Sequence, residues 1–172
     1  MNKEQLDRKW DHLRQMNGIA IRCVEMIPES KLDSHPIPNM RTPKELVVHL
    51  YAMSVREVIE GSARGEVTDV DEKAIVAGIK TRADLVQYCR DSWAAADRAT
   101  QTMTDAKLMA TVKTPWGMDF PAFVGYGIAN DELLHHRGQL YAFLRQMGAE
   151  VPSMWDFEHN APEYAPRAKS EA

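Results

Sequence analysis

Residues 121–147 have the pattern of one long helix that carries polar groups on its apolar side. Positions four apart lie on the same face of an α-helix, one above the other. The stripe predicted to face the core consists of Glu132, His136, Leu140, Phe143 and Met147. Polar groups in an apolar interior are unfavourable unless they are paired or bind a ligand. The rest of the chain must therefore bring a partner to this acid and this histidine.

Glu132 and His136 allow two interpretations. At i and i+4 they can reach one metal ion together, and carboxylate and imidazole ligands suit zinc, nickel, iron or manganese. They can equally form a buried polar pair without any metal. A metal site would need a third ligand, and His49 lies in another strong helical pattern. The alternative for His49 is a core histidine bonded to a neighbour such as Glu45, whereas His135 falls on the more polar stripe and is expected to point outward or sideways.

Three other segments have amphipathic helical periodicity: residues 3–27, 42–61 and 81–103. The second of them starts with a capping residue, a proline and an acid in Thr42–Glu45, which together mark the beginning of a helix. We expect residues 62–80 to be irregular, with one helical turn at 71–77, and residues 104–120 to form a short hairpin-like loop. The pattern predicts an all-α four-helix bundle, a fold that builds metal sites from facing helices.

Composition limits the classes of function. A chain of 172 residues with 44% apolar residues fits one domain, which we place at residues 1–155, followed by a loosely ordered tail at 156–172. The net charge of −4 provides no basic face for nucleic acid, and no apolar run approaches transmembrane length. Cys23 and Cys89 form no CxxC pair and are expected to be free buried thiols. We therefore expect a soluble cytoplasmic protein without nucleic-acid or membrane partners.

The last predicted helix resembles a known family. The run His136-Arg137-Gly138-Gln139-Leu140, with Tyr141–Gly148 and Val151-Pro152 after it, resembles the DinB/YfiT-like superfamily of four-helix proteins. The segment Glu45–Leu50 and the turn Thr114–Gly117 fit the same pattern, so the resemblance extends from the first helix to Pro152.

The resemblance implies a metal site inside the bundle. The resemblance implies a metal held by three ligands, which are usually histidines in this superfamily. One ligand lies on the second helix, and the other two lie four residues apart on the last helix. Carried over to this sequence, the ligands are His49, Glu132 and His136. Glu132 departs from the family pattern, because it changes three imidazoles into two imidazoles and one carboxylate. Such a set with open positions recurs in iron(II) and catalytic zinc sites.

The resemblance also implies an activity. Characterised relatives include transferases and isomerases that use a low-molecular-weight thiol such as mycothiol, bacillithiol or glutathione. The resemblance therefore implies a divalent metal (nickel, zinc, iron or manganese), a thiol cosubstrate and a small-molecule substrate, with hydrolysis as a related reaction. Arg137 and Tyr126 are candidate catalytic residues for substrate contact, although Arg137 can also pair with Asp131 or Glu45. A homodimer is implied too, with Gln139 as a candidate contact.

Two non-enzymatic alternatives stay open. The chain can be a metal-binding stress-response protein without turnover. It can also be a homodimeric interaction module in which Glu132 and His136 form only a buried polar network. Metal content separates the second alternative from the others, and thiol-dependent consumption of an electrophile separates the enzyme from the first.

Overall fold

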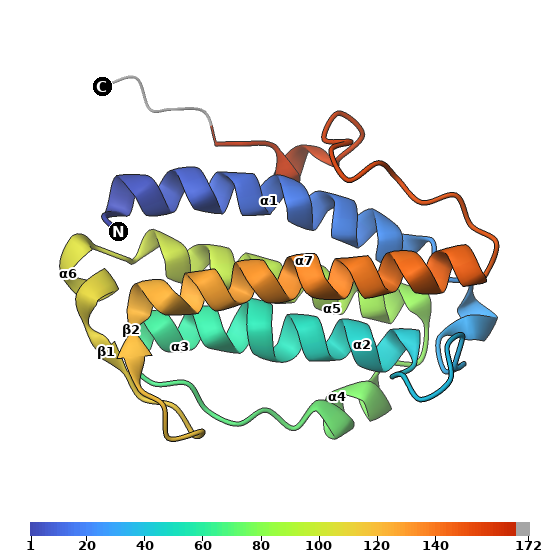
Figure 1. Ribbon diagram of the computed structural model, residues 1–172, viewed down its shortest axis with the longest axis horizontal. Helices are drawn as coiled ribbons and strands as arrows, with labels where there is room; N and C mark the ends of the chain where they lie inside the picture. Colours follow the sequence, from blue (N-terminus) through green and yellow to red (C-terminus); the bar gives the residue numbers. More distant parts are fainter. Residues whose placement is uncertain (168–172) are drawn as a thin grey trace.

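A computed structural model describes residues 1–167 and shows a bundle of four helical rods, which confirms the predicted fold class (Figure 1). The rods are α1 (Lys3–Glu25), the continuous run of α2 (Pro43–His49), η2 (Leu50–Glu57) and α3 (Val58–Arg64), then α5 (Arg82–Gln101), and α7 (Ala122–Gln146). The short elements between and after them are η1 (Glu29–Lys31), α4 (Glu72–Gly78), α6 (Asp105–Met109), β1 (Thr111–Val112), β2 (Phe120–Pro121) and η3 (Pro162–Tyr164). Within residues 1–167, none of the helices combines the length and the apolar character needed to cross a membrane.

The helices begin where side chains satisfy their first backbone N–H groups. The Thr42 hydroxyl accepts from the backbone N–H of Glu45, and the Glu45 carboxylate accepts from the N–H of Thr42, so the expected capping box is present. Thr81 and Asp84 form the same reciprocal pair at the start of α5. Glu45 is thereby engaged at the helix terminus, and His49 bonds to a different carboxylate, described below.

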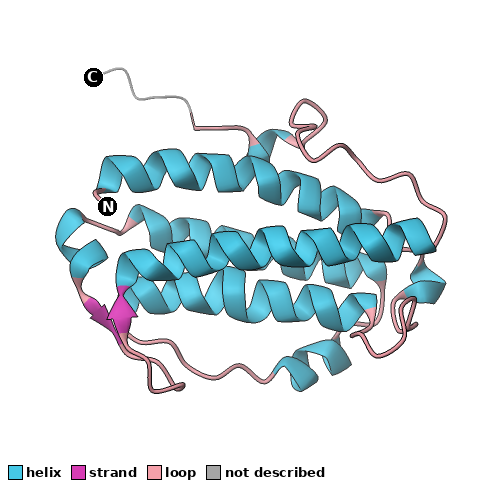
Figure 2. Cartoon of the chain, in the orientation of Figure 1, coloured by secondary structure: helices cyan, strands magenta, loops and turns pink. Residues whose placement is uncertain are grey.

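The predicted hairpin is present before the last helix. Strands β1 and β2 pair antiparallel with Val112 opposite Phe120, and they are the only strands among the described residues (Figure 2). The connection that precedes α5 is fixed to this hairpin, because the N–H of Val67 donates to the carbonyl of Lys113 over 2.8 Å. The single turn expected at 71–77 is α4, which lies beside α2 in the structure (Figure 1).

The second rod departs from regular α-helix directly after His49. In η2 the chain adopts π-helix, and the N–H of Val58 reaches the carbonyl of Met53 five residues back. Wider turns move side chains around the rod, and in this stretch Tyr51 is fully buried while Met53 is only half-buried. The Tyr51 hydroxyl donates to the Asn17 Oδ1 over 2.7 Å, and this pair forms a polar link inside the core.

The C-terminal segment is more ordered than the sequence predicts. Residues 156–172 were expected to be loose, but Tyr164 is buried against α1, and Arg22 Nη1 lies 2.9 Å from Asp156 Oδ2. The Asn160 amide donates to the carbonyl of Gln15 over 2.8 Å. This part of the tail therefore belongs to the folded unit, while residues 168–172 lie outside the described part of the chain.

Gly18 explains how the tail approaches α1 so closely. A Cβ atom at Gly18 would lie 2.5–2.8 Å from the carboxamide of Asn160, nearer than atoms can pack. The close neighbour of Gly18 is thus the C-terminal segment and not another rod. Cys23 and Cys89 are buried free thiols, as predicted, and burial raises the pKa of Cys23 to about 12.

Candidate metal centre

The structure brings the three predicted ligands together between the second and fourth rods. His49 ends α2, while Glu132 and His136 lie one turn apart on α7. One ligand atom from each residue lies within 4.8 Å of the other two, and the two imidazole rings stand nearly perpendicular with centroids 5.1 Å apart. Two ligands of one zinc ion lie at most roughly 4.4 Å apart, because each sits about 2.0–2.2 Å from the ion. A small closing movement of these side chains would therefore suffice.

His136 faces hydrogen-bond acceptors on both ring nitrogens. Its Nε2 is 2.9 Å from Glu132 Oε2, and its Nδ1 is 2.8 Å from Gln139 Oε1. The Gln139 amide nitrogen lies 3.0 Å from His135 Nε2, which agrees with its oxygen facing His136. A neutral imidazole has only one N–H, so it can donate to only one of these acceptors.

Protonation of His136, which would let it donate to both acceptors, is disfavoured by its burial. Burial lowers the pKa of His136, even though its contacts with Gln139 and Glu132 favour the charged form. The side chain is 6% exposed. If the proton stays on Nδ1 toward Gln139, the Nε2 lone pair and the Glu132 carboxylate face each other. A metal cation is the partner that both of these groups can bind, so the donor set fits a metal.

His49 is oriented by a residue that the sequence analysis did not identify. Glu72, the first residue of α4, places its Oε1 2.8 Å from His49 Nδ1. A carboxylate accepts, so the proton belongs on Nδ1, and Nε2 is left as the free ligand nitrogen of the ring. The only signal in the sequence was the unusual length of the connection at 62–80, since long loops often line sites.

Each candidate imidazole ligand therefore has its second nitrogen held by a side chain. Glu72 holds His49, and Gln139 holds His136. Metal-binding histidines almost always show this arrangement, because the outer hydrogen bond fixes the tautomer and the ring orientation. Gln139 was expected to serve a dimer contact, and the structure shows it engaged with both histidines of its own helix. The homodimer itself stays a prediction.

The centre opens toward solvent on its acidic side. The Glu132 side chain is 38% exposed, and Glu72 is 29% exposed. On the core side, His136 lines a void of only about 10 Å³, which is the space for about one water molecule. A substrate must therefore approach from the solvent side, and three protein ligands leave positions for it on the metal.

Arg137 lies behind the centre and points into the core. It is 4% exposed, its Nη1 is 3.1 Å from the sulfur of Met16, and its guanidinium lies 5.8 Å from the ring centroid of Tyr141. Within residues 1–167, no ion pair joins it to Asp131 or Glu45, so the pairing considered from the sequence is not observed. Arg137 is thus a buried cation beside the candidate metal ligands, without a carboxylate partner among these residues.

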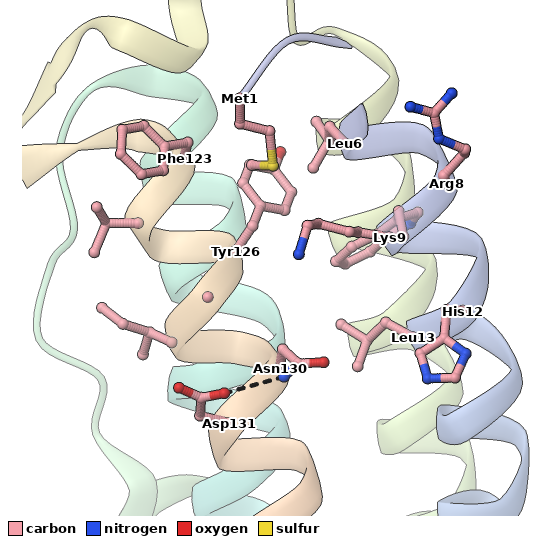
Figure 3. A pocket seen from close by; sticks show the side chains of 14 residues that line it. Met1, Leu6, Arg8, Lys9, His12, Leu13, Phe123, Tyr126, Asn130 and Asp131 are labelled. Atoms are coloured by element: carbon pink, nitrogen blue, oxygen red, sulfur yellow. Dashed lines mark hydrogen bonds between the residues drawn. The ribbon is translucent and has the colours of Figure 1, made fainter. Parts of the chain in front are cut away.

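Tyr126 lies far from the three ligands. It is ten residues before His136 on the same helix, which corresponds to about 15 Å along the axis. Its ring packs edge-on against Trp10 with centroids 5.7 Å apart, and it lines a groove of about 850 Å³ between α1 and α7 (Figure 3). The structure therefore does not bring Tyr126 to the candidate metal centre.

Comparisons with solved structures agree on the fold. A DinB-like protein from Bacillus subtilis aligns with a TM-score of 0.69 at 17% identity, over 87% of this chain and 96% of the other. A DinB-like protein from Bacillus cereus gives 0.69 at 18% identity, over 84% and 94%. YfiT from Bacillus subtilis, described as a probable metal-dependent hydrolase with an unusual four-helix bundle topology, gives 0.68 at 22% identity, over 87% and 91%. Such identities establish the shared fold alone.

Sequence comparison assigns the family. No curated protein sequence matches the chain significantly. The model of the DinB superfamily matches residues 5–140, which include nearly all of α1, the whole second rod, α5 and the part of α7 that carries Glu132 and His136. This match covers well over half of the chain and contains all three candidate ligands. The chain therefore belongs to the DinB superfamily.

Proposed function

We propose that this protein is a metal-dependent enzyme whose divalent ion is held by His49, Glu132 and His136. The observation that carries the proposal is that both imidazoles converge on one carboxylate while Glu72 and Gln139 hold their outer nitrogens. A purely structural polar pair needs no such orientation of two separate rings. The description of YfiT as a probable metal-dependent hydrolase supports the same class of chemistry.

The bound ion would supply Lewis acidity that lowers the pKa of a water molecule or of a low-molecular-weight thiol. Water as the nucleophile gives a hydrolase, and a thiol gives the transferase or isomerase that the family resemblance implies. The chain's own residues present the ligands and leave the acidic, solvent-facing side open for a small substrate. The buried charge of Arg137, next to His136 in the helix, would partly offset the negative charge of Glu132 from the core side.

Metal content of the purified protein tests the proposal. After incubation with zinc, nickel, manganese and iron(II) salts and removal of free ions, we expect about one ion per chain in the wild type. His49→Ala, Glu132→Ala and His136→Ala should each lose it. A wild type that retains none of the four ions would refute the metal site and leave the polar network as the alternative.

The control variant must be chosen with the hydrogen bonds in mind. His135→Ala is unsuitable because His135 contacts the Gln139 amide, which in turn orients His136. His35→Ala is better, since His35 is exposed in the connection between α1 and α2, where its Nδ1 hydrogen-bonds with the carbonyl of Met40. The loaded protein should then be assayed with an activated ester alone, and with an electrophile plus bacillithiol or glutathione, to separate hydrolysis from thiol transfer.

A further inference from the structure

The short helix α4 brings one carboxylate to the rim of the metal centre. Glu72 contacts His49 Nδ1 over 2.8 Å, and both side chains are about one quarter exposed. It is not among the three residues whose ligand atoms lie within reach of one ion. Its contact is therefore to the histidine and not to the position that a metal would take.

Hydrogen bonds of the residues that precede Glu72 hold it in place. The buried carboxylate of Glu57, at the end of η2, accepts hydrogen bonds from the backbone N–H and the hydroxyl of Thr68 over 2.6 and 2.8 Å. Asp71 then caps α4 by accepting from the N–H of Ala74 over 3.0 Å. These bonds fix the path of the connection up to the residue that meets His49.

The residues that follow Glu72 are anchored as well. Ile79, just after α4, is buried in the core, and its carbonyl accepts from Lys44 Nζ on α2 over 3.4 Å. Both ends of the α4 connection are thus attached to the second rod, which also carries His49. The contact between Glu72 and His49 belongs to one anchored unit, unlike an ion pair between two freely moving surface side chains.

We propose that Glu72 is a positioning residue that fixes the Nδ1–H tautomer and the ring orientation of His49, so that Nε2 is presented to the metal. This inference rests on the proposed metal site. A histidine that donates Nδ1–H to a carboxylate cannot carry its single proton on Nε2 while it is neutral. The nearby negative charge also makes the ring a stronger ligand. Removal of such an outer partner typically lowers metal affinity by about 10- to 100-fold.

The first test uses the metal-free protein. Uniformly ¹⁵N-labelled wild type and Glu72→Ala are compared at about pH 8 with a chelator present, where imidazoles are neutral. Long-range ¹H–¹⁵N spectra report which ring nitrogen carries the proton, and a His49→Gln spectrum identifies the His49 signals. We expect Nδ1–H in the wild type and a large shift toward Nε2–H in the variant. A wild-type His49 protonated on Nε2, or an unchanged tautomer in the variant, would overturn the inference.

The second test measures zinc affinity by competition with a chromophoric chelator. Glu72→Ala should bind zinc about tenfold or more weakly than the wild type. Asp69→Ala is the matched control, because it removes one exposed acid from the same connection, three residues earlier. An affinity for Glu72→Ala within about twofold of that control would refute the positioning role. If the wild type itself binds no zinc, the metal site fails, while the tautomer test still decides whether Glu72 controls His49.

Discussion

Replacing Glu132 by glutamine should have opposite effects on the metal-free and the metal-bound protein. In the metal-free state at about pH 8, Glu132 Oε2 lies 2.9 Å from a His136 nitrogen whose proton is expected on the other side of the ring. A glutamine at this position can turn its NH₂ toward that nitrogen and donate a hydrogen bond. The variant therefore gains a bond where the wild type has two facing acceptors.

The gain can be estimated from the structure. One net intramolecular hydrogen bond contributes about 0.5–1.5 kcal/mol, and the 38% exposure of the Glu132 side chain favours the lower half of this range. For a chain of this size, about 0.5–1 kcal/mol corresponds to a rise of roughly 1–4 °C in Tm. Zinc at 100 times its Kd should add about 2.7 kcal/mol to the wild type and little to the variant. The order of stability should therefore reverse when zinc is added.

Urea denaturation with a chelator, and again with zinc, measures both effects. Asp131→Asn is the matched control, because it removes the same charge from the adjacent residue, which is exposed and accepts a hydrogen bond from the Asn130 amide. If Glu132→Gln destabilises the metal-free protein by about 1 kcal/mol or more, Glu132 accepts a proton from His136 and the pair is a structural network. That result, with no stabilisation by zinc, would refute the reasoning that led to the metal centre.

Three further predictions concern stability outside the centre. Burial alone would raise the pKa of Asp97, but hydrogen bonds from Arg14 and an indole N–H outweigh it and hold the pKa below its ordinary value of 3.8. Asp97 therefore stabilises the fold above that pH, and this contribution is lost as pH falls through the lower folded pKa. The free energy of unfolding measured in urea from pH 5 to 2.5 should fall less steeply in Asp97→Asn than in the wild type. Gly18→Ala should displace the C-terminal segment and speed its limited proteolysis, whereas Gly127→Ala, with open space around it, should not. Tyr51→Phe should lower the free energy of unfolding by about 1–3 kcal/mol in urea, because the buried amide oxygen that it contacts loses its donor.

Helical spacing was sufficient to predict the bundle and the pairing of Glu132 with His136, whereas His49 as the third ligand was implied by the family resemblance. Glu132 and His136 are one turn apart whatever surrounds them, and His49 lies before the π-helical stretch begins. The burial of Tyr51 was beyond that reasoning, since a spacing of 3.6 residues fails inside η2. A π-helix has no reliable signature in a single sequence, so a regular helical spacing misplaces side chains between residues 50 and 57.

Glu72 and the tail were missed for a different reason. Both lie in polar, irregular stretches whose positions depend on contacts with distant residues. Glu72 reaches His49 only because Glu57 and Lys44 anchor the two ends of its connection. The tail docks because Gly18 leaves room for Asn160. Composition describes such segments as loops, and only the folded structure shows which atoms they meet.

The identity of the metal should decide between the two reactions in the proposal. Thiolate ligands suit zinc, whereas carboxylate and water ligands suit harder ions such as manganese. Glu132 supplies a carboxylate where the family resemblance implies an imidazole, and Glu72 adds negative charge behind His49. This charge would favour a harder ion. A protein that retains manganese or iron(II) in preference to zinc would therefore favour hydrolysis, whereas strong preference for zinc would favour activation of a thiol.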